Sequence, residues 1–261
     1  MTNEIHVLDH GSILLVETWG SDRRIIEAAR MSTDKGFLGW GPIHKDTCPA
    51  QLKDVPGHHD AVCNCAPTQG DERLLAYLYN NKHMTPFEMA GMIVEVKAPI
   101  FVFREWHRHR TQSYNEMSAR YIPLPDENYR PTAARCVPPS TTSSTSRQAT
   151  GAVSCTPSEE EIQNWLYSLD QACAQAQFVY RKGLLLGIPK ELARLPVPVA
   201  RYSKMRASAN LRNWLAFLTL RMDVHAQWEI RQYANAVGYL IQEYFPRTWD
   251  LFSKETGHGS K

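Results

Sequence analysis

The most charged stretch of the chain, residues 104–121, reads REWHRHRTQSYNEMSARY. It contains four arginines and two histidines: Arg104, Arg108, Arg110, Arg120, His107 and His109. Cations held this close together repel one another, and the carboxylates of Glu105 and Glu116 offset only part of their charge. Because guanidinium groups make forked hydrogen bonds to phosphate oxygens, the stretch predicts a bound anion.

The residue types of this stretch allow two interpretations. An arginine-rich segment is commonly a solvated basic face or an RNA-binding cluster, in which Trp106 and Tyr114 would stack on bases. The formal net charge of the 261-residue chain is only +2, which argues against a general nucleic-acid binder. In an enzyme, Ser113, Asn115 and Ser118 would add donors and acceptors for a base or a ribose.

The composition is that of an ordinary globular protein, with 43% apolar and 21% charged residues. No apolar run is long enough to cross a bilayer, and residues 1–5 have no feature of a secretory signal. Six cysteines in a chain of this length do not indicate a disulfide scaffold. We therefore expect a cytoplasmic protein with reduced thiols and no membrane partner.

The pattern of turns, caps and apolar spacing predicts strands mainly in the first half of the chain and helices mainly in the second. Expected in the first half are two strands within residues 5–19, a helix capped by Ser21 or Asp22, a helix opening at Asp71, a capping box at Thr85–Glu88 with proline at the first helical position, a strand over 92–96, and a short helix from Pro99 to Trp106. These elements indicate an α+β fold.

Helices dominate the expectation for the second half. Ser158 with Glu161 forms a capping box for a long helix that Gly187 ends, with an apolar stripe of Ile162, Trp165, Leu166, Leu169, Cys173 and Ala176. Four further elements are expected after this helix: a short helix over 189–195, an extended segment over 197–209, a helix from Asn210 to Met222 and a last helix over 225–244. We expect a single domain over residues 1–261, with an antiparallel or mixed sheet flanked by long helices.

Two segments without periodicity, residues 36–70 and 131–157, are predicted to be loop insertions. The first contains a group of potential zinc ligands: Cys48, His58, His59, Cys63 and Cys65. A zinc-stabilised interaction protein is therefore a third hypothesis. The spacing matches no standard zinc motif, since one residue separates Cys63 from Cys65, and we expect no metal site.

The order of residues within 104–121 resembles the signature of the flavin-dependent thymidylate synthases. The matching positions are Arg108-His109-Arg110, Ser113, Asn115, Glu116, Ser118 and Arg120. Three further segments resemble the same family: His83–Glu88, Lys97–Val102 and Leu220–Ile230. The similarity extends over most of residues 5–36, 71–125 and 158–250, and so many fixed positions are far more specific than a short glycine motif.

The resemblance implies an FAD-dependent enzyme whose flavin is held at contacts between subunits. The implied flavin-binding positions are His83, Thr85, Arg108, His109, Arg110, Glu116, Asn210, Leu211, Arg212 and His225. Arginines and a helix start are chemically suited to the pyrophosphate and to the flavin carbonyls. For His83 and His225 the alternative is a core histidine. The family often has asparagine at the position of Ala216.

For the dUMP site, the resemblance implies Glu105, Trp106, His107, Arg108, Glu116, Met117, Ser118, Ala119, Arg120, Arg194 and Arg221. Arg221 is the implied catalytic group, because a fixed guanidinium beside the uracil would stabilise negative charge on the ring. Without the family resemblance, Arg221 would be assigned a salt bridge to Asp223 or Glu229. Ser118 is the second catalytic candidate; it has no adjacent base, so its hydroxyl is expected to orient dUMP. Some members have glutamine in place of Glu105.

The implied reaction is the reductive methylation of dUMP to dTMP. Methylenetetrahydrofolate donates the carbon, and FAD reduced by NADPH supplies the hydride. The family forms homotetramers with shared active sites, which we expect here as well, without a nucleic-acid partner. Each hypothesis predicts something different: the enzyme consumes NADPH in the presence of dUMP, a nucleic-acid module binds oligonucleotides with a steep salt dependence, and a zinc protein unfolds with a chelator.

Overall fold

The computed structural model describes residues 4–41, 70–137 and 156–257. The chain divides into two compact units. Unit 1 consists of residues Met1–Val16, Ile93–Ser208 and Leu220–Val237, and unit 2 consists of Glu17–Met92, Ala209–Thr219 and Gly238–Lys261. The assignment of residues 1–261 to one domain stays a prediction.

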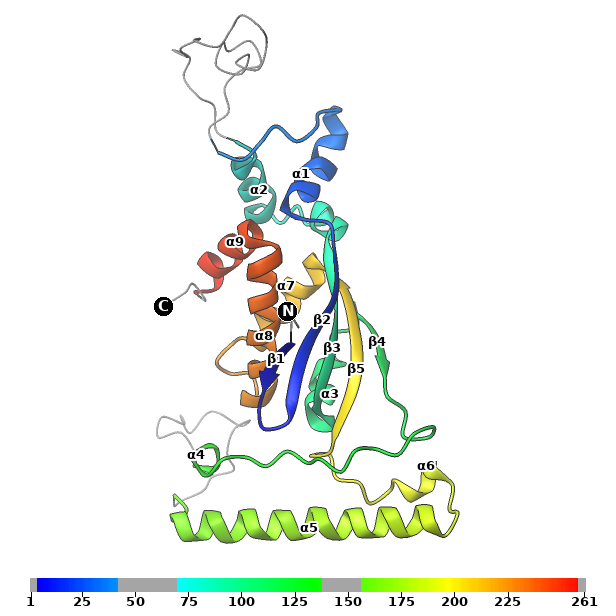
Figure 1. Cartoon of the computed structure of the whole chain (residues 1–261). Helices are drawn as coiled ribbons and strands as arrows, with labels where there is room; N and C mark the ends of the chain where they lie inside the picture. Colours follow the sequence, from blue (N-terminus) through cyan, green and yellow to red (C-terminus); the bar gives the residue numbers. More distant parts are fainter. Residues whose placement is uncertain (1–3, 42–69, 138–155, 258–261) are drawn as a thin grey trace, which may run out of the picture. The chain divides into compact units, whose positions relative to one another are not determined.

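The strands of the described residues form one five-stranded sheet in the order β1-β2-β3-β5-β4 (Figure 1). They are β1 (Glu4–Val7), β2 (Gly11–Trp19), β3 (Gly91–Pro99), β4 (Ser113–Glu116) and β5 (Tyr202–Asn210). β1 pairs antiparallel with β2, Glu4 facing Leu14, and β4 pairs antiparallel with β5, Ser113 facing Ser208. The expected strands are confirmed. β4 was not expected, because its residues Ser-Tyr-Asn-Glu show no alternation of apolar and polar side chains.

Helices make up most of the remaining described chain, which confirms the α+β class. They are α1 (Asp22–Arg30), α2 (Asp71–Asn80), α3 (Ile100–Trp106), α4 (Ala133–Cys136), α5 (Glu159–Leu185), α6 (Lys190–Ala193), α7 (Leu211–Arg221), α8 (Trp228–Tyr244) and α9 (Pro246–Thr256), with 3-10 helices η1 (Met31–Thr33) and η3 (Thr85–Met89). α8 begins three residues later than expected. α9 was missed, although Pro246 in its first turn is a recognisable start signal.

Local capping signals in the sequence are confirmed at the start of α1 and at both ends of α5. The Ser21 side chain accepts from the backbone N–H of Arg24 at the start of α1. Ser158 and Glu161 form the expected capping box at α5, and Gly187, with a positive φ of 76°, follows the end of that helix. Each of these signals involves residues no more than three positions apart, so the sequence alone carries it.

The capping box expected at Thr85–Glu88 is wrong. The segment forms the 3-10 helix η3, in which no side chain caps the first turn, although Pro86 does occupy its start as expected. The Glu88 carboxylate does not reach back to the backbone, because it accepts a hydrogen bond of 2.5 Å from Arg212 instead. A long-range ion pair has replaced the local contact.

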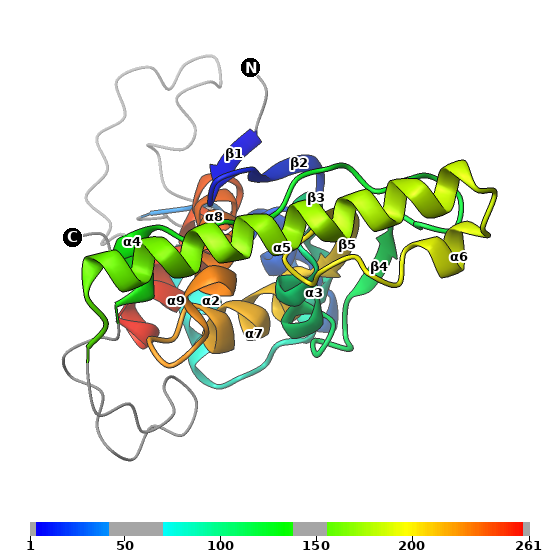
Figure 2. The ribbon, with the colours of Figure 1, turned by 90° about the horizontal axis from the view of Figure 1, so that it is seen from below.

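Unit 1 contains β1 and β4, most of β2, β3 and β5, and the helices α3, α5 and α6. Figures 1 and 2 show α4 beside the N-terminal end of α5 and α6 beside its C-terminal end. α5 buries Ile162, Leu166 and Tyr180, whereas Trp165 is exposed, so the expectation that Trp165 lies on the buried stripe is wrong. Its position places the indole outside the narrow face that α5 turns inward.

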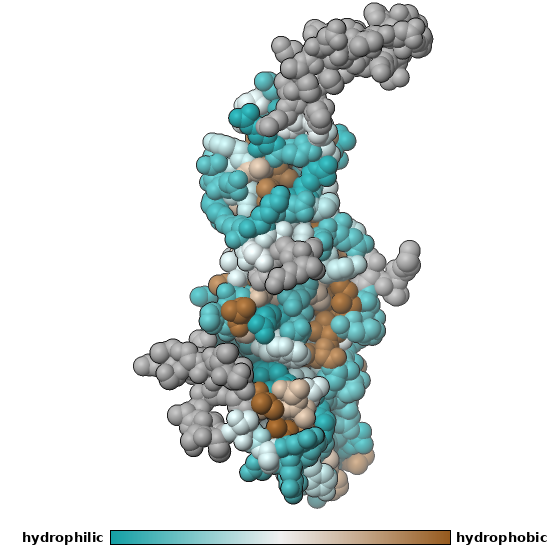
Figure 3. All heavy atoms as spheres, turned by 90° about the vertical axis from the view of Figure 1, so that its left-hand side faces the viewer, coloured by the Kyte–Doolittle hydropathy of each residue, from teal (hydrophilic) through white to brown (hydrophobic). Residues whose placement is uncertain are grey.

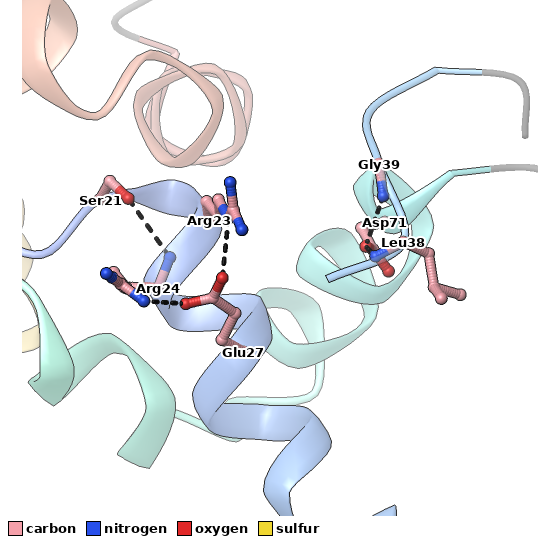
Figure 4. A network of polar contacts seen from close by, with 7 residues as sticks. All are labelled: Ser21, Arg23, Arg24, Glu27, Leu38, Gly39 and Asp71. Carbon is pink, nitrogen blue, oxygen red and sulfur yellow. Dashed lines mark hydrogen bonds and ion pairs between the residues drawn. The ribbon is translucent and has the colours of Figure 1, made fainter. Parts of the chain in front are cut away.

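Unit 2 contains α1, α2, η3 and α9, which contact one another. Asp71, fully buried, ties the start of α2 to other segments, as the close-up in Figure 4 shows. Its carboxylate accepts from the backbone N–H groups of Leu38 (2.7 Å) and Gly39 (3.2 Å) and pairs with Arg30. The charge is tolerated in the interior because both oxygens have hydrogen-bond donors.

The candidate zinc ligands Cys48, His58, His59, Cys63 and Cys65 lie outside the described residues, as does most of the 131–157 insertion. Within residues 4–41, 70–137 and 156–257, no group of three or more His, Cys, Asp or Glu side chains is placed to hold a metal ion. In those same ranges no helix is long and apolar enough to cross a membrane. Figure 3 shows hydrophobic side chains in small groups on a mostly hydrophilic face.

Candidate active site

The charged stretch begins at the end of α3, turns through residues 107–112 and continues into β4. Trp106 is fully buried, and its indole N–H donates to the side-chain oxygen of Gln112 at 3.0 Å. The Tyr114 hydroxyl donates to the carbonyl oxygens of Trp106 (3.1 Å) and His109 (2.7 Å), and burial raises the pKa of Tyr114 to about 12. These bonds close the turn from inside, so that its charged side chains face outward.

Arg221, the last residue of α7, is brought to this turn. Its Nε donates to Nε2 of His109 at 2.8 Å. Its Nη1 donates to Oε2 of Glu105 at 2.9 Å, and its Nη2 donates to the Glu105 carbonyl at 2.8 Å. The side chain of Arg221 is 15% exposed, and all three residues belong to unit 1. A guanidinium with three hydrogen bonds in a partly dry setting is an oriented cation.

The protonation of His109 follows from this contact. Because Nε2 accepts a hydrogen bond from Arg221, the ring is neutral and its proton is on Nδ1. Burial, and secondly the positive charge of Arg221, lower the pKa of His109 to about 4, against the opposing effect of Glu105. At neutral pH His109 is therefore an acceptor and adds no charge to the arginine cluster.

The alternative partners considered for Arg221 are wrong. Asp223 accepts from the backbone N–H of His225 at 2.7 Å. Glu229 is buried and accepts from Tyr129 (3.2 Å) and from Arg135 (2.9 Å). Both carboxylates are therefore engaged elsewhere in unit 1.

The expected stacking of a base on the Trp106 ring is wrong, whereas stacking on Tyr114, whose ring is partly exposed, stays a prediction. The Trp106 ring is enclosed in the core, edge-on to Tyr233, and the Tyr114 hydroxyl is committed to two backbone carbonyls. The ring of Trp106 therefore supports the turn from the core, and the expected role of Trp106 in dUMP binding stays a prediction.

Residues 117–121 form a second turn, which is tied to α6. The Ser118 hydroxyl accepts from the backbone N–H of Arg120 at 3.3 Å. Arg120 pairs with Glu191 (3.0 Å), and Lys190 donates to the Tyr121 carbonyl at 2.7 Å. Arg194 is the C-terminal capping residue of α6, and Ala119 is buried. The polar groups predicted for a phosphate thus lie on a turn and a helix that are linked directly.

The candidate flavin residues of unit 1 are mainly exposed. The side chain of Arg108 is 74% exposed, with only a long 3.7 Å ion pair to Glu105, and Arg110, Glu116 and His225 are exposed too. Their exposure rules out the core interpretation of His225. Guanidinium groups without strong carboxylate partners are suited to a pyrophosphate, so the donor chemistry here fits FAD.

The candidate flavin residues of unit 2 comprise His83, Thr85, Asn210, Leu211 and Arg212. His83 and Thr85 are exposed, so His83 is not a core histidine. Asn210 caps α7 through its side chain, which accepts from the Asn213 N–H at 2.9 Å. Leu211 is fully buried, and its N–H donates to the Ala90 carbonyl, which leaves this N–H no role as a flavin donor.

Four residues that support these turns were missed in the sequence: Gln112, Tyr114, Lys190 and Glu191. The first two are uncharged members of the charged stretch, and the last two belong to a short helix 70 residues away. Their partners lie across the fold, and a pattern within one segment does not reveal them.

Comparison with known proteins places the chain in a family. The family model described as thymidylate synthase complementing protein (Thy1) matches residues 14–247. A flavin-dependent thymidylate synthase of Thermus thermophilus is 35% identical over 257 residues, which are 98% of this chain and 80% of that protein. The chain belongs to the flavin-dependent thymidylate synthase family. Another member, from Thermosipho melanesiensis, is 34% identical, with 96% of this chain and 94% of that protein covered.

The fold agrees with this membership of the flavin-dependent thymidylate synthases. The UMP/dUMP methylase PolB of Streptomyces cacaoi, bound with 5-Br UMP, superimposes with a TM-score of 0.73 at 28% identity and covers 97% of both chains. The same enzyme bound with 5-Br dUMP gives a TM-score of 0.72 and covers 96% of this chain. The resemblance inferred from residues 104–121 is thereby confirmed, and membership of the family implies FAD as the cofactor.

Proposed function

We propose that this protein methylates dUMP to dTMP, with methylenetetrahydrofolate as carbon donor and NADPH-reduced FAD as hydride source. Family membership and the similarity to a UMP/dUMP methylase support this activity. The observation that carries it is the arrangement of Arg221, which family resemblance names as catalytic and which has three hydrogen bonds to Glu105 and His109.

Arg221 acts on the pyrimidine. A guanidinium beside the uracil N3 edge favours the form of the ring that carries negative charge, which makes C5 a better nucleophile. Arg221 stays protonated at neutral pH, so it acts as an electrostatic partner and not as a base. Its bonds to the described residues engage three of the five guanidinium N–H groups, which leaves two for an acceptor on the substrate.

The remaining dUMP contacts come from the two turns of unit 1 and from α6. Ser118 and Arg120 bind the phosphate through backbone and side-chain donors, and Arg194 adds a second guanidinium. Ser118 orients the nucleotide and does not attack it, because its hydroxyl already accepts from a backbone N–H and has no base beside it. The other contacts are those of Glu105, His107, Arg108, Glu116, Met117 and the backbone of Ala119.

Each of the two units has residues that we propose as contacts to FAD. Arg108 and Arg110 pair with its phosphates, and His109, Glu116 and His225 complete the unit 1 contribution. In unit 2 the residues proposed for FAD are His83, Thr85, Asn210 and Arg212, and Leu211, which is fully buried, would support them from the core. When bound, FAD would carry a hydride from the nicotinamide to the carbon transferred from folate. The protein supplies binding, orientation and electrostatics.

We further propose a homotetramer with shared active sites, the use of NADPH and a cytoplasmic location. The exposed apolar side chains of α5 support assembly, since Trp165, Phe178 and Leu185 are 53%, 60% and 88% exposed. Light scattering of the purified protein tests the tetramer. A monomer with full activity would contradict shared active sites.

The experiment that tests the activity uses the purified chain saturated with FAD. Desalted protein should retain close to one flavin per chain, and it should form dTMP from dUMP, methylenetetrahydrofolate and NADPH. Omission of dUMP should abolish dTMP formation. Arg221→Lys should lower it strongly, whereas Arg23→Lys, the same change at an exposed arginine of α1, serves as a matched control. Protein that retains flavin but forms no dTMP would overturn the proposed function.

A further inference from the structure

Arg221 has a long side chain, which without partners would populate many rotamers. Ordering such a side chain costs conformational entropy. A catalytic cation must be oriented before the substrate arrives, because reorganisation during the reaction would raise the barrier. The groups that order Arg221 therefore determine how well it can act.

The ordering groups lie on two sides of the guanidinium. Glu105, in the last turn of α3, engages both terminal nitrogens, one through its carboxylate and one through its main-chain carbonyl. His109 engages Nε from the following turn. Because these contacts involve all three nitrogens of Arg221, they fix the plane and the rotation of the guanidinium together.

The histidine is itself held in place by the turn. Its backbone N–H donates to the Trp106 carbonyl at 3.0 Å, and its carbonyl accepts from the Tyr114 hydroxyl at 2.7 Å. Trp106 is fully buried, so these bonds connect the imidazole to the core of unit 1. Arg108, one position earlier in the same turn, offers a contrast, since it is largely exposed and has only a 3.7 Å ion pair.

We propose that His109 and Glu105 are positioning residues that orient Arg221, with His109 acting as a neutral hydrogen-bond acceptor. This role goes beyond the flavin and dUMP contacts implied for the two residues, and it rests on the proposed function of Arg221. The charged groups that face the imidazole are Arg221 and Glu105. A protonated His109 would lose its acceptor nitrogen and repel the guanidinium, so the neutral ring is essential to the arrangement.

The first test uses the ligand-free protein and needs no turnover. NMR of the histidine ring nitrogens should show His109 with its proton on Nδ1 at neutral pH and with a lowered pKa. Arg221→Met should raise that pKa, because it removes the nearby positive charge. A proton on Nε2, or a pKa that Arg221→Met leaves unchanged, would overturn the proposal. This outcome is independent of whether the protein forms dTMP.

The second test is a double-mutant cycle on flavin-saturated protein. His109→Phe removes the acceptor and should lower kcat roughly 10–100-fold, since small displacements of catalytic groups have effects of that size. His109→Gln, which offers an amide oxygen to Nε, should recover most of the loss. In an Arg221→Lys background, His109→Phe should have little further effect, because the group it positions is gone.

The outcomes of the cycle separate the proposal from its alternatives. Flavin content and KM for dUMP are measured for every variant, because His109 is also a candidate flavin contact. Equal losses of kcat from His109→Phe in both backgrounds would overturn the positioning role. A wild-type protein that forms no dTMP would instead overturn the proposed function, and the NMR result would still decide the geometry around Arg221.

Discussion

Two arginines of unit 1, Arg221 and Arg201, are held in very different ways. Arg201 is fully buried and donates to the Pro125 carbonyl (2.6 Å) and to the side chain of Gln177 on α5 (2.8 Å). Burial lowers the pKa of Arg201. Arg221 is partly exposed, and its partners are a neutral imidazole and a carboxylate. Arg201 links α5 to the 125–126 segment, whereas Arg221 is a partly exposed cation that a ligand could contact.

The difference teaches how to tell a structural cation from a functional one. The partners of Arg201 come from α5 and the 125–126 segment, and the side chain of Arg201 is fully buried. The partners of Arg221 leave 15% of its side chain exposed. We therefore expect changes at Arg201 to affect mainly stability and changes at Arg221 to affect mainly turnover.

The largest expected effect is that of Arg221→Lys on catalysis. Lysine retains the charge but cannot make the forked contacts, so kcat for dTMP formation should fall by about 10²–10³-fold, as when an electrostatic donor is removed from an active site. Steady-state kinetics at saturating FAD measures this loss. If Arg221→Lys lowered thermal stability enough to account for the lost activity, Arg221 would be a structural residue like Arg201.

The second effect is that of Arg201→Met on stability. The change leaves the buried oxygen of Gln177 without its donor, which should lower the free energy of unfolding by roughly 1–3 kcal/mol. Arg181→Met is a matched control, because Arg181 also pairs with Asp126 (3.1 Å) but is mostly exposed; it should change stability by less than about 1 kcal/mol. Urea unfolding compares the two variants. Equal losses would show that the burial of Arg201 is irrelevant.

The third effect concerns pH and sharpens the Arg221 side of the comparison. The folded protein binds a proton at His109 only near pH 4, whereas an unfolded chain binds it near pH 6.5. The unfolded state therefore holds more protons in this window, and the contribution of His109 to stability is complete above pH 6.5 and is lost as the pH falls to about 4. His109→Gln should remove this part of the pH dependence. A stability difference between the two proteins that stays constant across the window would contradict it.

The smallest effect tests the helix that Arg201 fastens. Ser158→Ala removes the capping box of α5 and should lower the free energy of unfolding by about 1 kcal/mol. Ser168→Ala is the control within the same helix, because the Ser168 hydroxyl only donates back to the Asn164 carbonyl and caps nothing. The midpoint of thermal unfolding should be lower for Ser158→Ala than for Ser168→Ala. A lower midpoint for Ser168→Ala would show that the bond between Arg201 and α5 makes the capping box unnecessary for stability.

Much of the fold was predictable because its signals are local. Ser21, Ser158 with Glu161, and Asn210 act on backbone groups within three residues, and all of them cap helices where expected. The capping box at Thr85–Glu88 failed because Glu88 has a stronger partner in Arg212, 124 residues away. Trp165 failed for a related reason, since apolar spacing shows a stripe but not how wide a face the neighbouring segments cover.

The sequence by itself determined the α+β class, the helix caps and the family signature, because short-range spacing encodes each of these. It also named Arg221 as the residue to examine. Only the tertiary structure decided that Arg221 is held by His109 and Glu105, 112 and 116 positions away, and not by the nearby Asp223 or Glu229. The physical reason is that the end of α7 is brought to the turn after α3 by the packing of the whole unit, which no local pattern contains.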